Sequence, residues 1–162
     1  MEGQEAARLA ERFGPAVYRL AYTRMGNAAD AEDVTQDVFL RLLTKAPDFS
    51  DDDHAKAWLL RVTVNRANDL FRSPWSRREP LEATDTFASQ AQDAPGEIVM
   101  AVLALPPKLR VVVHLFYYEE LSVSQIAQML KVREGAVKTR LSRARAILRR
   151  NMLEGGEKDA AG

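Results

Sequence analysis

One stretch near the middle of the chain, SPWSRREPLEATDTFASQAQDAPG (73–96), interrupts an otherwise periodic sequence. It holds three prolines, small polar residues and scattered acids, a composition that is typical of a linker. On both sides of it apolar residues recur at helical spacing, and no segment of useful length alternates in the manner of a β-strand. The sequence therefore predicts an all-α protein. Two small helical domains, over 1–72 and 96–153, are joined by a flexible linker over 73–95 and followed by a disordered tail over 154–162.

The overall composition excludes several classes of protein. The 162 residues carry 23 basic and 23 acidic side chains, and 46% of them are hydrophobic, as in an ordinary globular protein. There is no cysteine, so disulfides and thiolate metal sites are excluded. The amino terminus carries acids and has no long apolar core, so we expect no signal peptide. The longest apolar runs fall short of the roughly 20 residues that a membrane span requires. We therefore expect a cytoplasmic protein that does not insert into a membrane.

The first half predicts four helices. Proline suits the start of a helix better than its interior, so we expect Gly14–Pro15 to separate the first two. Gly26–Asn27 is expected to form a turn before the third. The expected helices cover residues 6–13, 15–25, 29–46 and 55–72.

The predicted helix over 29–46 has two distinct faces at 100° per residue. The expected buried stripe consists of Ala31, Val34, Val38 and Leu42, widened by Phe39 and Leu43. The opposite side carries Asp33, Gln36, Asp37, Leu40 and Thr44. Such a side is usually solvated, but a leucine among acids could also mark a contact surface.

The predicted helix over 55–72 also has a core side and a polar side. Its expected core residues are Trp58, Leu59, Val62 and Leu70. Its polar side gathers amides and cations, namely Lys56, Asn65, Arg66, Asn68, Asp69 and Arg72. Such groups pair with bases and phosphates, and they are equally common on any solvated helix.

The second half is the basic part of the chain. Residues 96–162 hold 11 basic and 7 acidic side chains, a net charge of +4, and eight of the cations lie between Lys131 and Arg150. We expect a short helix closed by Pro106–Pro107, a second over 107–120 and a third after Ser122. Ser122 and Gln125 are spaced as a capping box. A turn over 131–133 then leads into a basic helix from Glu134, which makes the last two helices a helix-turn-helix.

The residue pattern of the expected basic helix indicates a face that reads DNA. Val137, Leu141, Ala144 and Leu148 fall on one inward stripe, so the charges lie elsewhere. A helix in the major groove presents its first turns to base edges and its flanks to phosphates. The residues expected on the reading side are Lys138, Thr139, Ser142 and Arg143. Those expected at phosphates are Arg140, Arg145 and Arg149. A solvated basic face is the alternative, and a lipid-binding helix would need bulkier apolar anchors.

Three motifs together resemble a known family. They are DAEDVTQDVFLRLL (30–43), AWLLRVTVNRANDLFR (57–72) and LPPKLRVVVHLFYYEELSVSQIAQMLKVREGAVKTRLSRARAILRR (105–150). In this order, separated by a variable linker, they resemble bacterial sigma factors of the extracytoplasmic-function (ECF) group. The resemblance covers about residues 10–152. It implies a protein that is not an enzyme, needs no cofactor, and directs core RNA polymerase to promoter DNA.

The resemblance also implies roles for particular residues. In the first domain, sigma region two, it implies a core polymerase contact by Asp33, Gln36, Asp37, Leu40 and Arg41. It implies that the loop over 46–54 and one helix hold the unpaired promoter strand, with Trp58, Asn65, Arg66, Asp69 and Arg72. In the second domain, sigma region four, it implies duplex reading by Lys138, Thr139, Arg140 and Arg143. Lys131 stands where the family often has glycine and Ala136 where it often has threonine, which bears on base preference.

Three other interpretations stay open at this stage. Asp51, Asp52, Asp53 and His54 could be imagined as a site for a hard metal ion, although acids before a helix more often form a cap. The final helices would equally suit a stand-alone helix-turn-helix regulator that never meets polymerase. The resemblance further implies that an anti-sigma factor could hold the protein inactive.

Overall fold

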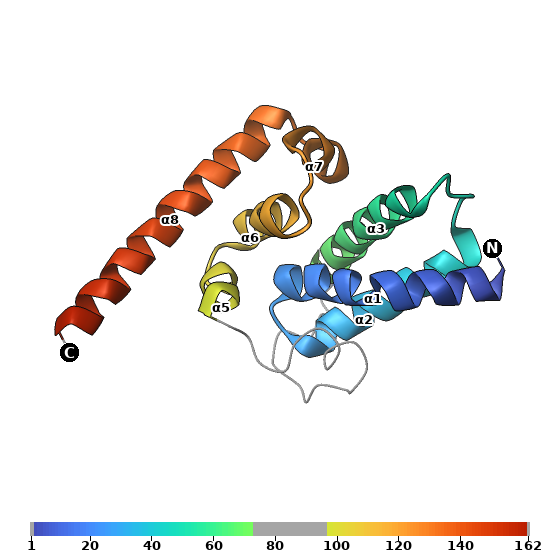
Figure 1. Ribbon diagram of the computed structural model, residues 1–162, viewed down its shortest axis with the longest axis horizontal. Helices are drawn as coiled ribbons and strands as arrows, with labels where there is room; N and C mark the ends of the chain where they lie inside the picture. Colours follow the sequence, from blue (N-terminus) through green and yellow to red (C-terminus); the bar gives the residue numbers. More distant parts are fainter. Residues whose placement is uncertain (1, 73–96, 162) are drawn as a thin grey trace. The chain divides into compact units, whose positions relative to one another are not determined.

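The structure, a computed structural model, describes residues 2–72 and 97–161. It describes their side chains except those of Arg72, Glu97 and residues 154–161. The chain divides into two compact units between Ala94 and Pro95 (Figure 1). The predicted linker over 73–95 lies outside the described residues. The described residues form helices and no strand, in agreement with the all-α prediction.

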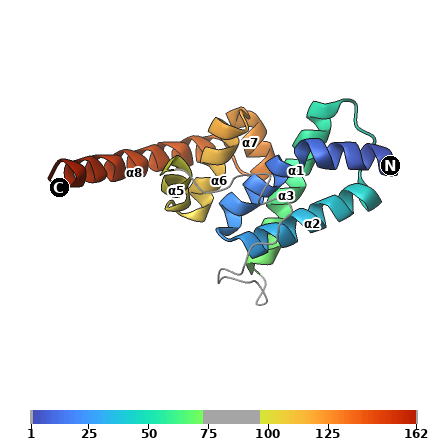
Figure 2. The ribbon, with the colours of Figure 1, turned by 60° about the horizontal axis from the view of Figure 1, so that its bottom comes forward.

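The first unit is a group of three helices that all pack on one another. They are α1 (Gly3–Met25), α2 (Ala28–Lys45) and α3 (Asp52–Arg72), as Figures 1 and 2 show. Their shared core includes Leu9, Phe13, Val17, Val34, Val38, Leu42 and Leu59. Gly26 ends α1 with φ 82°, and the Asn27 side chain accepts a hydrogen bond of 2.8 Å from the Asp30 N–H. The predicted turn at Gly26–Asn27 is therefore confirmed.

The predicted break at Gly14–Pro15 is wrong, because α1 runs through Pro15 as one helix. A proline inside a helix costs about 3 kcal/mol, since it removes one backbone hydrogen bond and crowds the preceding turn. Leu9, Phe13, Val17 and Leu20 on both sides of it are at most 8% exposed. Burying each such side chain contributes about 1.5 to 3 kcal/mol. Because both halves of α1 cover the same core, their burial outweighs the cost of the proline.

The buried stripe of α2 agrees with its prediction at four positions. Ala31, Val34, Val38 and Leu42 are at most 1% exposed, and Phe39 packs at the edge of the core. Leu43 was expected to widen this stripe, but it is 52% exposed. It follows Leu42 by one position and so lies about 100° further round the helix, beyond the sector that α1 and α3 cover.

The buried face of α3 is turned relative to its prediction. Leu59 is fully buried, whereas Trp58, Val62 and Leu70 only line the margin of the core. The other buried positions are Ala55, Leu60, Thr63, Val64 and Ala67. The Thr63 hydroxyl donates to the Leu59 carbonyl at 2.6 Å, so this polar group enters the core already satisfied.

The second unit contains the predicted helix-turn-helix. Its elements are α5 (Glu97–Leu103), α6 (Pro107–Val113), a π-helical turn η1 (His114–Tyr118), α7 (Val123–Leu130) and α8 (Glu134–Ala161). Gln125 N–H donates to the Ser122 hydroxyl at 3.1 Å, and Ser122 N–H donates to the Gln125 side chain at 2.8 Å. The predicted capping box is therefore confirmed. The backbone of α8 continues over 154–161, where we predicted a disordered tail, and the domain boundary at 153 stays a prediction.

None of the helices among the described residues is long and apolar enough to cross a membrane.

The turn between α7 and α8 has a left-handed residue at its centre. Lys131 has φ 59° and ψ 45°, and the Val132 N–H donates to the Ala127 carbonyl at 3.0 Å. A side chain in this conformation brings its Cβ close to the following carbonyl, which glycine avoids. The turn therefore supplies a physical reason why glycine would suit position 131.

We expect Lys131→Gly to raise the free energy of unfolding of the protein by about 0.5 to 1 kcal/mol, because relief of the strain exceeds the added entropy of the unfolded chain. Thermal and denaturant unfolding measure the change. Lys131→Ala is the matched control, since it removes the same charge and keeps the Cβ. An equal gain in both variants would mean that the charge, and not the backbone, limits stability here.

Candidate nucleic-acid interface

The second unit presents the predicted reading residues on one side of α8. Val137, Leu141 and Ala144 are at most 2% exposed, because α6 and α7 pack against this face of α8. Lys138, Thr139, Ser142 and Arg143 are all exposed. Leu148 was expected on the buried stripe and is only half-buried. The helix thus buries its apolar stripe and leaves hydroxyls and cations at its first turns, where base edges of a DNA groove would be met.

The cations expected at phosphates do not share one environment. Arg149 is exposed and Arg140 is half-buried. Arg145 donates from Nε to the Tyr117 hydroxyl oxygen at 2.6 Å, and its guanidinium lies 5.6 Å from the centre of the Tyr117 ring. η1 therefore orients this arginine along the flank of α8. Sequence reasoning missed Tyr117, because only the packing of η1 beside α8 brings residues 28 positions apart together.

The first unit gathers the five predicted polymerase-contact residues on α2, outside the core. Gln36 and Leu40 are exposed, while Asp33, Asp37 and Arg41 are half-buried. Leu40 is 59% exposed, and Leu43 adds a second exposed leucine to the same helix. Together the two leucines give this side of α2 exposed apolar area that association with a protein partner would bury.

The predicted strand-binding residues on α3 are partly engaged within the protein. Asn65 and Asp69 are exposed, and the Arg72 side chain lies outside the described residues. Trp58 is half-buried against Phe49, with ring centres 5.7 Å apart in an edge-on arrangement. The Trp58 indole therefore packs against Phe49 of the loop that precedes α3.

An ion pair connects the two predicted interfaces of the first unit. Arg66, expected at the promoter strand, lies 2.9 Å from a carboxylate oxygen of Asp37, expected at polymerase. Asp69 lies 3.6 Å from the same guanidinium. The helical patterns did not predict this contact, since Arg66 and Asp37 belong to different helices. The pair therefore joins one residue of each predicted surface, and the two surfaces meet at this contact.

Asp51 caps the start of α3. The Asp51 carboxylate accepts a hydrogen bond of 2.8 Å from the His54 N–H. The Ser50 N–H in turn donates to His54 Nδ1 at 3.1 Å. Within 2–72 and 97–153 no group of three or more histidines and acids is arranged to hold a metal ion. The structure thus favours the cap over the metal interpretation.

Two family models match the chain. Sigma-70 region 2 matches residues 9–77, and Sigma-70, region 4 matches residues 96–148. Each match covers one of the two structural units. The order of the two matches along the chain is the order of the motifs quoted above.

Individual relatives match over most of the chain. The ECF RNA polymerase sigma factor SigW of Bacillus subtilis is 28% identical, over 85% of this chain and 83% of its own length. The ECF RNA polymerase sigma factor SigL of Mycobacterium tuberculosis is 33% identical, over 91% of this chain and 89% of its own. The chain spans only 61% and 59% of two further relatives.

A solved structure shares the fold. CnrH, solved in complex with the cytosolic domain of CnrY, aligns with a TM-score of 0.65 and 27% identity, over 95% of this chain and 90% of that one.

Proposed function

The chain belongs to the ECF group of RNA polymerase sigma factors, which direct core RNA polymerase to promoters, and from this premise we propose which of its surfaces carry out each step. The observation that carries the proposal is the division of faces in α8. Its apolar stripe is at most 2% exposed between Val137 and Ala144, and its hydroxyls and cations face outward. We place this action in the cytoplasm, where polymerase and promoter DNA are found, and assign the protein no catalytic centre of its own.

We propose that α8 reads the upstream promoter element in the major groove. Lys138, Thr139, Ser142 and Arg143 are the base-reading residues, because they lie exposed on the first turns of the helix. Arg140, Arg145 and Arg149 contact phosphates on the flanks. The hydrogen bond to Tyr117 leaves both terminal nitrogens of Arg145 available for a phosphate oxygen.

We propose that α2 binds core polymerase through Asp33, Gln36, Asp37, Leu40 and Arg41. The exposed leucine supplies apolar contact area, and the carboxylates supply charge that a basic polymerase surface would complement. Leu43 joins this surface, since it is 52% exposed on the same helix.

We propose that the loop over 46–54 and α3 capture the unpaired strand of the promoter element nearest the start site. Asn65 offers an amide that can hydrogen-bond a base, and Trp58, Arg66, Asp69 and Arg72 complete the surface. Binding of an unstacked base offsets an unstacking cost of a few kcal/mol, so opening needs no nucleotide hydrolysis.

We further propose a protein partner that masks the sigma factor. The relative CnrH was solved in a complex with the cytosolic domain of another protein. An anti-sigma factor is the corresponding expectation for this chain. A stand-alone regulator is the less favoured alternative, because it leaves the match of the first unit to Sigma-70 region 2 without a role.

The proposal is tested by adding the protein to core RNA polymerase that lacks any sigma factor, with fragmented genomic DNA of the source organism. We expect discrete transcript starts that depend on the protein and share two upstream elements, as sequencing of the 5′ ends would record. Salt-sensitive duplex binding without such starts would leave only the stand-alone regulator.

Asp37→Asn should weaken binding of the protein to core polymerase and leave duplex promoter binding unchanged, because the two surfaces lie on different units. Co-purification with polymerase and a duplex gel-shift assay measure the two effects. Arg66→Gln is the matched control, since it breaks the same ion pair from the other side. We expect the Arg66→Gln variant to keep its binding to core polymerase and to lose its binding to the unpaired promoter strand. Equal loss of polymerase in both variants would assign the effect to the ion pair and not to Asp37.

Arg143→Ala should weaken binding to the specific duplex by about 1 to 3 kcal/mol and relax the sequence preference at one base pair. Competition between promoter and random duplexes measures both. Arg149 lies on the flank of α8, so Arg149→Ala should instead weaken binding to all duplex sequences alike. It should also make duplex binding less dependent on salt concentration. A uniform loss in Arg143→Ala would move Arg143 to the phosphate contacts.

A further inference from the structure

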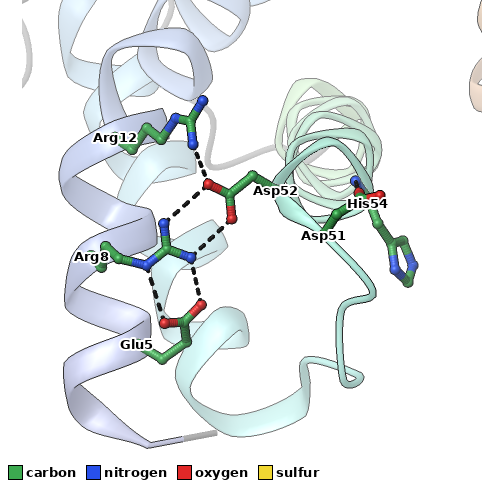
Figure 3. A network of polar contacts seen from close by, with 6 residues as sticks. All are labelled: Glu5, Arg8, Arg12, Asp51, Asp52 and His54. Carbon is green, nitrogen blue, oxygen red and sulfur yellow. Dashed lines mark hydrogen bonds and ion pairs between the residues drawn. The ribbon is translucent and has the colours of Figure 1, made fainter.

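A network of four charged side chains ties α1 to the first residue of α3 (Figure 3). Arg8 donates from its two terminal nitrogens to the two oxygens of Asp52, at 3.0 and 2.9 Å. Arg12, one turn further along α1, donates to the same carboxylate. Glu5 accepts two hydrogen bonds from Arg8, at 3.1 and 2.7 Å, and so holds that guanidinium in place. Two cations of α1 thus converge on one carboxylate.

Stability alone does not account for this network. Its side chains are 28 to 60% exposed, and exposed ion pairs contribute about 0 to 1 kcal/mol. The core of the unit lies elsewhere, among residues such as Leu9, Phe13 and Leu59. The network adds a directional contact between α1 and the first residue of α3, beside the core contacts that pack the two helices together.

The loop before α3 is fastened to that starting point. Asp51 caps the helix, and Ser50 hydrogen-bonds to the His54 ring. Phe49 packs edge-on against both His54 and Trp58, with ring centres 5.2 and 5.7 Å apart. Figure 3 shows Asp51 and Asp52 pointing to opposite sides of the chain, one to the helix and one to α1. The loop is therefore held at two places: Phe49 packs against the core, and the contacts of Asp52 with Arg8 and Arg12 hold the residue that follows the loop.

The network also neutralises charge beside the loop. Asp51, Asp52 and Asp53 would together repel a phosphate backbone, but Arg8 and Arg12 cancel the charges of Glu5 and Asp52. The hydrogen bonds from Arg8 lower the pKa of Asp52 below its usual value, so the carboxylate stays charged and clamped as the pH falls through the ordinary range of aspartate. The contact is lost only as the pH falls through that lowered pKa.

We propose that Asp52, held by Arg8 and Arg12, is a positioning residue for strand capture. It holds residues 46–51, the part of the 46–54 segment that precedes α3, in the arrangement that receives the unpaired promoter strand. The inference rests on the proposed function of that loop. A loop held in its binding arrangement loses less conformational freedom when the strand binds, so capture is tighter. Neither arginine has to touch the DNA for this effect.

Asp52→Asn and Asp53→Asn form a matched pair for the test. Both remove one negative charge from the same turn of α3, and only Asp52 takes part in the network. The readout is promoter opening by reconstituted holoenzyme, followed by 2-aminopurine fluorescence in the unpaired strand. Closed-duplex binding and the melting temperature are measured alongside. We expect Asp52→Asn to lower the opening equilibrium roughly three- to tenfold with duplex binding unchanged. Asp53→Asn reports the effect of the lost charge alone, so opening should fall further in Asp52→Asn than in Asp53→Asn.

Two further variants separate positioning from other roles. Asp52→Glu keeps a carboxylate within reach of the arginines and should restore most of the opening. Arg12→Gln breaks one arm of the clamp from α1 and should reproduce part of the loss. Equal opening in Asp52→Asn and Asp53→Asn, or an increase in both, would overturn the inference and leave charge repulsion as the dominant effect. Failure of the wild-type holoenzyme to open any promoter would instead overturn the proposed function.

Discussion

The burial of one apolar stripe on each long helix is the constraint on which the rest of this protein depends. α2 buries Ala31, Val34, Val38 and Leu42, and α8 buries Val137, Leu141 and Ala144. An amphipathic helix can turn only one face to its neighbours, so the same burial decides which polar residues face outward. The proposed polymerase surface and the proposed base-reading surface are each the side of a helix that lies opposite its buried stripe.

Electrostatic contacts refine these surfaces without holding the fold together. Arg66 pairs with Asp37 between α2 and α3, Arg145 hydrogen-bonds to Tyr117, and Arg8 joins Glu5 to Asp52. Each contact is partly exposed, and such contacts contribute little to stability. Their effect is to reduce the orientations that a long side chain samples, which lowers the entropy lost on binding. Positioning, and not stabilisation, is the role that we propose for these arginines.

The roles proposed for the two units suit the distribution of charge along the chain. The chain as a whole is neutral, yet residues 96–162 carry a net charge of +4 and residues 1–72 a net charge of −2. A basic unit is attracted to the duplex before any base is read. Under the proposed function the acidic first unit has to accept a DNA strand, and we propose that the pairing of Asp52 with two arginines is one arrangement that permits it.

The sequence by itself determined the helical class, the division into two parts, the capping box at Ser122 and Gln125, and the exposed face of α8. These follow from local rules: helical periodicity, side-chain caps and the spacing of cations. Only the tertiary structure decided that α1 continues through Pro15, that Leu43 lies outside the core, and that Asp52 meets Arg8 and Arg12. Each of these depends on which helix covers which neighbour. A continuous α1 requires burial on both sides of the proline, and Arg8 reaches Asp52 only because packing places residues 44 positions apart side by side.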